Sequence, residues 1–195
     1  MTDTPATDGQ EHAVVWRFLP HPGHEHARLS RIDGLWRLAG SAVFAHASAP
    51  CRLDYEVHCD EGWKTLRAAV EGWIGGRRVE MEMAADDGRW TRGGDPCPDV
   101  DECVDADLGF SPSTNLLPIR RLGLDVGESA VVRAAWLRFP DLSFRPLDQR
   151  YTRTGDRTWR YESGGGAFTA DLEVDAAGMV RRYGDVWIAE AGMPD

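Results

Sequence analysis

Side chains suited to ligand binding or catalysis gather in one stretch near the middle of the chain, residues 103–122. Around Pro112 and Pro118 this stretch carries carboxylates, hydroxyls, an amide and two adjacent guanidinium groups. Because proline fixes the torsion φ and short polar side chains bond their own backbone, the composition predicts a shaped loop or a crossover between two sheets. The side chains predicted to contact a ligand here are Asp105, Asp107, Ser111, Thr114, Asn115, Arg120 and Arg121.

The adjacent arginines near the end of this stretch have two interpretations. A guanidinium group can bind a phosphate or carboxylate head group through two parallel hydrogen bonds. Alternatively, one arginine forms a salt bridge with Asp105 or Asp107 and ties the crossover to the sheet. Neighbouring residues on a strand point to opposite faces, so one arginine could be buried against the acids while the other faces solvent. We favour the salt bridge, and likewise a turn-capping role over sugar binding for Thr114 and Asn115.

Ser111 and Ser113 are candidate nucleophiles, but a serine nucleophile needs a base. All six histidines lie at or before residue 58, and the chain contains neither a G-x-S-x-G elbow nor an S-x-x-K motif. Glycine motifs that bind phosphates or dinucleotides are also missing. We therefore assign no catalytic residue and expect no cofactor, and a hydrolase acting on a lipid-like metabolite is the alternative.

Metal-binding patterns are incomplete in this sequence. The cysteine spacings, C-x7-C and C-x5-C, lack the close pairs of structural zinc sites. The acids between Asp95 and Asp107 do not match an EF-hand loop, and the pair His24 and His26 lacks the further ligands of a cupin site. We expect no metal site. Reduced thiols are the favoured state, although a disulfide between Cys97 and Cys103 would close a small loop.

Charge and hydropathy exclude several classes of partner. Lys and Arg number 22 against 32 Asp and Glu, which gives a formal net charge of -10. Nucleic acid and anionic membrane surfaces both require a basic face, so neither is expected as a partner. No stretch approaches the ~20 apolar residues of a membrane helix, and the first dozen residues lack the features of a secretory signal. We expect a soluble, cytoplasmic protein without membrane insertion.

The elements that position the central stretch are predicted to be β-strands. Residues 51–59 alternate strictly, with hydrophobic side chains at odd positions and charged or histidine side chains at even ones. This period of two is typical of an antiparallel strand with one buried face, and it places His58 among carboxylates on the polar face. Residues 36–44 and 78–83 alternate in the same way, whereas residues 21–26 are predicted to form a loop.

Turn signals such as Gly75-Gly76 and Asp86-Asp87-Gly88 separate about a dozen such strands. With hardly any helical periodicity, the pattern predicts an all-β fold, an antiparallel β-roll or incomplete barrel. A strand–turn–strand echo between the two halves suggests duplicated β-meanders. We expect a disordered tail over residues 1–12 and a single domain over 13–192, divisible into subdomains 13–100 and 101–192.

The tryptophans add aromatic surface to the candidate site. Tryptophan is more often a core residue than a ligand contact, but its ring can also stack on a sugar. The candidates for such stacking are Trp63, Trp73, Trp90, Trp136 and Trp159. We include Trp63 and Trp90 among the predicted ligand contacts.

The central stretch also carries a family resemblance. The run Asp105-x-Asp107 … Ser111-Pro112-x-Thr114-Asn115-x-Leu117-Pro118-Ile119-Arg120-Arg121-Leu122 resembles the signature of the bacterial Putative glycolipid-binding family. Weaker matches extend over most of residues 14–188. The resemblance implies a β-roll of two similar parts, related in shape to lipoprotein carriers of the Lol type, which hold acylated ligands in the concavity of an incomplete barrel. It implies no catalytic residues.

Together these observations predict a binding protein rather than an enzyme. The expected ligand is a small amphiphile, a glycolipid or an acylated metabolite, held in an apolar concavity with a few polar contacts. A hydrolase and a protein-interaction module with an exposed apolar face are the alternatives.

Overall fold

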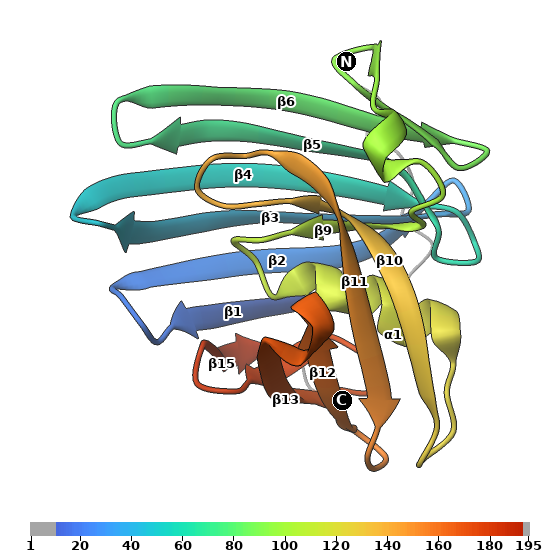
Figure 1. Ribbon diagram of the computed structural model, residues 1–195. Helices are drawn as coiled ribbons and strands as arrows, with labels where there is room; N and C mark the ends of the chain where they lie inside the picture. The colour runs from blue at the N-terminus through green and yellow to red at the C-terminus, as the bar shows by residue number, and fades with distance from the viewer. Residues whose placement is uncertain (1–10, 193–195) are drawn as a thin grey trace.

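The computed structural model describes residues 11–192, which form one 15-stranded sheet and a single short α-helix (Figure 1). The strands are β1 (His12–Phe18), β2 (Gly23–Ile32), β3 (Leu35–His46), β4 (Ala49–Cys59), β5 (Thr65–Ile74), β6 (Arg77–Asp86), β7 (Arg89–Arg92), β8 (Asp95–Pro96), β9 (Asp105–Leu108), β10 (Ser129–Leu137), β11 (Phe144–Arg153), β12 (Thr158–Ser163), β13 (Phe168–Val174), β14 (Val180–Tyr183) and β15 (Trp187–Gly192). The helices are α1 (Leu116–Leu122) and the 3-10 turns η1 (Pro98–Val100), η2 (Ser113–Asn115) and η3 (Gly164–Gly166).

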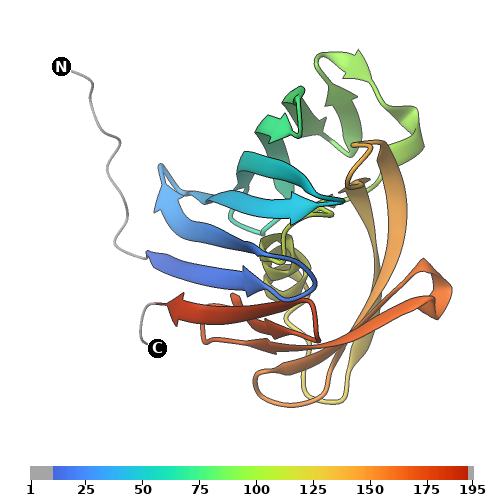
Figure 2. The same cartoon turned by 90° about the vertical axis from the view of Figure 1, so that its left-hand side faces the viewer.

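The strand order shows two meanders joined side by side. Strands β1 to β8 follow one another in the sheet, as do β9 to β15, and the pairing of β1 with β15 connects the two sets. All pairs are antiparallel except β9 with β10. The sheet curls around α1 without closing, and its free edges are β8 and β9 (Figure 2). The all-β class and the open, barrel-like architecture predicted from sequence are therefore confirmed.

Local sequence explains the long strands of the first meander. In β4 the alternation predicted over residues 51–59 is confirmed, because the odd-numbered side chains are at most 4% exposed and the even-numbered ones face outward. The turn between β6 and β7 has positive φ at both Asp87 and Gly88, 45° and 75°. Aspartate followed by glycine tolerates this geometry, which matches the twist of a two-residue hairpin.

The central stretch is helical where a loop or strand crossover was expected. Leu116, Leu117 and Ile119 of α1 are at most 6% exposed and pack in the concave side of the sheet. Pro118 lies in the first turn, where its missing N–H costs no hydrogen bond, and Gly123 ends the helix in the left-handed conformation. We predicted that Arg120 and Arg121 point to opposite faces because they lie on a strand. This prediction is wrong, since both residues lie on α1. The expected apolar concavity is filled by this segment.

Two other boundaries differ from expectation. The loop predicted for residues 21–26 is wrong beyond residue 22, because β2 begins at Gly23 and pairs with both β1 and β3. The predicted tail, residues 1–12, lies outside the described residues except for its last two, and His12 begins β1. Among the described helices, none has the length and apolarity to cross a membrane.

Candidate functional site

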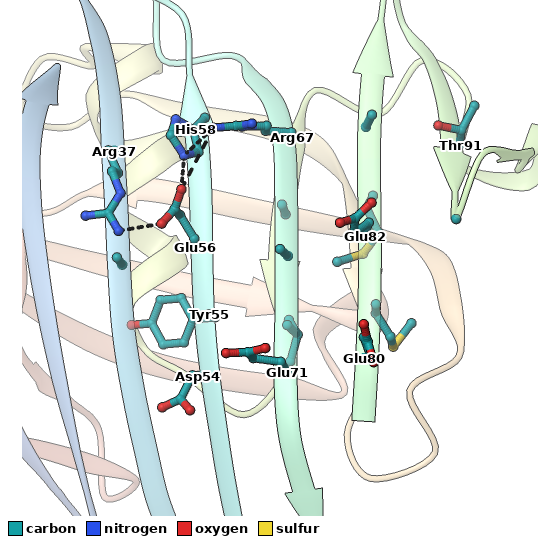
Figure 3. Close-up of a pocket in the computed structure, with 18 of the residues that line it drawn as sticks. Arg37, Asp54, Tyr55, Glu56, His58, Arg67, Glu71, Glu80, Glu82 and Thr91 are labelled. Atoms are coloured by element: carbon teal, nitrogen blue, oxygen red, sulfur yellow. Dashed lines mark hydrogen bonds and ion pairs between the residues drawn. The ribbon is translucent and has the colours of Figure 1, made fainter. Parts of the chain in front are cut away.

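An open groove with a volume of about 810 Å³ crosses β3–β7 on the face turned away from α1 (Figure 3). The polar positions of these strands face the groove, because the alternate positions face the core. The charged and histidine side chains that line it are Arg37, Asp54, Glu56, His58, Arg67, Glu71, Glu80 and Glu82. Strand register arranges these side chains in rows across β3, β4, β5 and β6.

The first row contains the cationic side chains. Arg37, His58 and Arg67 lie directly opposite one another on β3, β4 and β5. The Glu56 carboxylate of the next row accepts hydrogen bonds from Arg37 and His58 and lies 3.9 Å from an Arg67 nitrogen. Partial burial opposes ionisation of Glu56, but the hydrogen bonds from Arg37 and His58 outweigh it and lower its pKa to about 2. This end of the groove therefore holds an ionised, well-partnered carboxylate.

The second row alternates small and acidic side chains. Ala39, Glu56, Ala69 and Glu82 lie opposite one another across the four strands. Ala39 and Ala69 flank Glu56 on the two neighbouring strands. Because they carry only methyl groups, the sheet surface beside Glu56 is open. A ligand of several ring atoms has room there above the sheet.

The third row is acidic. Asp54, Glu71 and Glu80 occupy directly opposite positions on β4, β5 and β6. Arg52 donates to Asp54 at 2.5 Å and Arg78 lies 2.8 Å from Glu80, whereas the carboxylates of Glu71 and Glu82 have no hydrogen-bond or ion-pair partner within residues 11–192. Like charges placed directly opposite destabilise a sheet. The stability of the sheet therefore does not explain Glu71, the member of this row whose carboxylate has no partner among the described residues.

The next row along the strands lies beside the groove, outside its lining, and is partly apolar. Val43, Arg52, Trp73 and Arg78 lie opposite one another, and the side chains of Trp73 and Val43 are 48% and 56% exposed. Trp73 follows Glu71 by two residues on β5, so both project from the same face about 7 Å apart along the strand. An exposed indole thus stands beside an unpartnered carboxylate.

The residues predicted to contact a ligand lie on the opposite, inward side of the sheet. Asp105 in β9 is 1% exposed, and Arg121 in α1 donates to its two oxygens at 3.0 and 2.5 Å. Burial raises the pKa of Asp105, and the hydrogen bonds and charge of Arg121 oppose that rise. The salt bridge predicted between the crossover and the sheet is confirmed, and Arg121 is the arginine that forms it.

Asp107, Thr114 and Asn115 form a second polar cluster under the second meander. Gln149 Nε2 donates to Asp107 Oδ2 at 2.6 Å, and Thr114 Oγ1 lies 3.4 Å from the other oxygen. Burial raises the pKa of Asp107 to about 6, although the hydrogen bonds from Gln149 and Thr114 lower it. The Tyr151 hydroxyl donates to Asn115 Oδ1 at 2.9 Å. Thr114 and Asn115 thus connect η2 to β9 and β11, and the bond from Gln149 connects β11 to β9.

Arg120, Trp63 and Trp90 also have partners within the chain. The Arg120 guanidinium lies 5.3 Å from the centre of the Trp63 ring, a cation–π contact, and Trp63 in turn stacks on Trp36. Trp90 Nε1 donates to the Cys103 carbonyl at 2.8 Å. Ligand contact by the residues of the central stretch and by these two tryptophans stays a prediction, and in this conformation other parts of the chain hold them.

Ser111 belongs to a buried network that sequence reasoning missed. Glu25 in β2 is 1% exposed, and its Oε1 accepts the hydroxyls of Ser111 at 2.5 Å and Tyr55 at 2.6 Å. Burial raises the pKa of Glu25 to about 8 despite these hydrogen bonds. The sequence carries a signal for this position, because Glu25 alternates with Ala27 and Leu29 on an apolar face, but the neighbouring histidines, proline and glycine favour a loop.

The groove residues were likewise not predicted as a site. The outward alternation of Asp54, Glu56 and His58 was visible, yet only strand register brings them beside Glu71 and Glu80. Within residues 11–192, no group of three or more His, Cys, Asp or Glu side chains is placed to hold a metal ion. All four cysteines are free thiols.

Comparisons with other proteins agree with this description. The chain is similar to a DUF1089 family protein from Pseudomonas aeruginosa whose crystal structure is known, with 33% identity, a TM-score of 0.73 and coverage of 82% of this chain and 88% of that chain. Among curated proteins the sequence has no match. The family model described as Putative glycolipid-binding matches residues 13–189. The chain therefore belongs to the Putative glycolipid-binding family.

Proposed function

We propose that this protein binds, without chemical conversion, a glycolipid whose uncharged sugar head group lies in the groove on β3–β7. The observation that carries the proposal is the pair of unpartnered carboxylates in the groove, Glu71 and Glu82, together with the exposed Trp73, which lies beside the groove two residues beyond Glu71 on β5. Ionised carboxylates only accept hydrogen bonds, and sugar hydroxyls are donors of matching size. The apolar face of a sugar ring packs on an indole.

The charge of the groove favours an uncharged sugar over an anionic head group. Five carboxylates and two guanidinium groups line it, and the guanidinium of Arg37 is already engaged by Glu56. A phosphate or fatty-acid carboxylate placed near Glu71 and Glu82 would be repelled. An uncharged polyol meets acceptors at the acidic row and donors at the cationic row.

The central stretch has a supporting role in this proposal. Its polar side chains hold α1 in the concave face through contacts such as Arg121 with Asp105 and Tyr151 with Asn115. The residues predicted to contact the ligand would then set the shape of the sheet, and through it the spacing of the groove rows.

A titration with paired amphiphiles tests the proposal. An alkyl glucoside and an alkyl phosphate with the same short chain are added below their micelle concentrations and followed by calorimetry. Native mass spectrometry of the freshly purified protein identifies any bound amphiphile beforehand. We expect binding of the glucoside and weaker binding, or none, of the phosphate. Preference for the phosphate, or failure of both to bind an amphiphile-free protein, would contradict the proposal.

A hydrolase is the second candidate, and one observation favours it. Ser111 donates to Glu25, whose pKa of about 8 would suit a general base at neutral pH. However, Ser111 is 8% exposed, and neither it nor Glu25 lines either described cavity. A substrate carbonyl has no route to Ser111 Oγ in this conformation. Binding without reaction is therefore the function that the geometry supports best.

A further inference from the structure

Glu25 lies where the sheet meets the segment 110–122, which fills its concave face. While Oε1 accepts two hydroxyls, Oε2 is buried and has no hydrogen-bond partner within residues 11–192. A buried carboxylate with an unsatisfied oxygen is strongly disfavoured. The arrangement is better suited to a protonated carboxyl group, because a neutral Oε2 hydroxyl loses much less hydration than a charged oxygen.

The surroundings of Glu25 give an ionised carboxylate no counter-charge. Its cross-strand neighbours, Trp16 on β1 and Ala42 on β3, are uncharged and 0% exposed. β4 and the segment contribute only the hydroxyls of Tyr55 and Ser111, and the pKa of Tyr55 is raised well above its ordinary value by burial. Burial likewise raises the pKa of Glu25 to about 8.

The segment 110–122 is joined to different strands by different polar contacts. Neither η2 nor α1 pairs with a strand. Ser111 bonds Glu25 at the beginning of the segment, and Arg121 bonds Asp105 at its end. Between these contacts Thr114 bonds β9 and Asn115 accepts from Tyr151 of β11, and buried apolar side chains such as Leu116 and Leu117 pack on the sheet. Of these polar contacts, the bond from Ser111 to Glu25 is the one that joins the segment to β2.

We propose that Glu25 is a proton-controlled latch, which keeps the segment 110–122 in the concave face when protonated and releases it when ionised. An ionised Glu25 is an unpaired charge, and water reaches it only if the segment moves. The sheet face beneath, with Trp16, Leu38 and Leu53, is apolar and would then accept a hydrocarbon chain. The latch lies on the inward face, whereas the proposed sugar groove lies on the other face of the same strands (Figure 3), so the latch can be tested without a sugar ligand.

Amide hydrogen exchange measured between pH 6 and pH 9.5 tests the latch in the full-length chain. After correction for the intrinsic exchange rate, we expect protection of segment 110–122 to fall above about pH 8, by about tenfold for each further pH unit. In Glu25→Gln, which keeps an oxygen acceptor but cannot ionise, protection should stay constant. The matched control Glu173→Gln, an exposed acid of β13 outside the groove, should behave as the wild type does.

The wild type alone also decides the question if Glu25→Gln fails to fold. Peptides from β13, far from Glu25 in the sheet order, serve as an internal reference. A latch predicts loss of protection in the segment before any loss in β13. Equal loss in both regions, constant protection of the segment up to pH 9.5, or an unchanged pH response in folded Glu25→Gln would overturn the proposal.

Discussion

Trp73 is an exposed aromatic side chain whose neighbours on the sheet are Arg52 and Arg78 rather than other apolar groups. If it stacks on the sugar, Trp73→Ala should weaken alkyl glucoside binding by two- to tenfold, since aromatic pairs contribute about 0.5–1.5 kcal/mol beyond area burial. Trp73→Phe should keep part of the affinity. Calorimetric titration measures both, and Phe168→Ala, which removes a 42%-exposed aromatic side chain from the second meander, is the control. Equal affinity in Trp73→Ala and the wild type would remove this residue from the site.

Arg121 and Asp105 form a buried ion pair, so removing one partner leaves the other uncompensated. We expect Arg121→Ala to lower the free energy of unfolding by about 3–5 kcal/mol, because Asp105 stays buried without a counter-charge. Urea denaturation followed by circular dichroism measures the loss. The double variant Arg121→Met with Asp105→Asn should recover much of the stability, since it removes both charges together.

A loss of ligand binding without a loss of stability would contradict this structural role of Arg121. If Arg121→Ala unfolds at the same urea concentration as the wild type but binds the glucoside less well, Arg121 acts on the ligand. Arg120→Ala is a useful comparison, because Arg120 contacts the Trp63 ring instead of a carboxylate.

At the scale of one strand, Gly40 in β3 makes the Glu25 network possible. A Cβ at this position would lie 2.4 Å from the Tyr55 hydroxyl oxygen and 2.6 Å from the His26 carbonyl oxygen. Gly40→Ala should therefore displace the Tyr55 ring and destabilise the protein by about 1–3 kcal/mol. Gly76→Ala, where a Cβ meets no atom within 4 Å, is the matched control in thermal unfolding. Equal melting temperatures for the two variants would show that Tyr55 adapts at no cost.

How far sequence predicts each element depends on where its stabilising contacts come from. β4 was predictable because its alternation of buried and exposed residues is written within the strand itself. α1 was not, because seven residues that include Pro118 form a helix only when the curved sheet buries Leu116 and Leu117. The partners of the salt bridge, Asp105 and an arginine of the central stretch, could be predicted from sequence. The prediction assumed that the arginine lies on a strand, whereas it lies on α1. The groove could not be predicted, since its rows exist only once β3 to β6 pair in register.

At the scale of the whole molecule, one set of strands serves two faces. β4 presents Asp54 and Glu56 to the groove and Tyr55 to the Glu25 network, as successive residues of a strand must. Because the same strands form both faces, the curvature of the sheet around α1 determines the spacing of side chains on each face. Movement of the segment 110–122 would let the sheet change its curvature, and so couple the concave face to the spacing of the groove rows.

The stability of the whole sheet should depend on pH in an unusual direction. Burial raises the pKa of Glu25 from 4.5 to about 8 and that of Asp107 from 3.8 to about 6. For a raised pKa, the stabilising contribution is complete below the unfolded-state value and is lost as pH rises through the folded-state value. Glu56, with its pKa lowered to about 2, contributes above pH 4.5 and loses its contribution in acid. Maximum stability is therefore expected near pH 5 rather than at neutral pH.

Urea denaturation at pH 5, 6.5 and 8 measures this dependence. At ~1.4 kcal/mol per pKa unit, ionisation of Glu25 lowers the free energy of unfolding by at most about 4 kcal/mol between pH 5 and pH 8. Glu25→Gln should be less sensitive to pH over this range and relatively more stable at pH 8, whereas Glu173→Gln, at an exposed position of β13, should follow the wild type. A wild-type free energy of unfolding that is constant or rises from pH 5 to pH 8 would mean that Glu25 is already ionised in the folded protein, with water or a ligand group at Oε2.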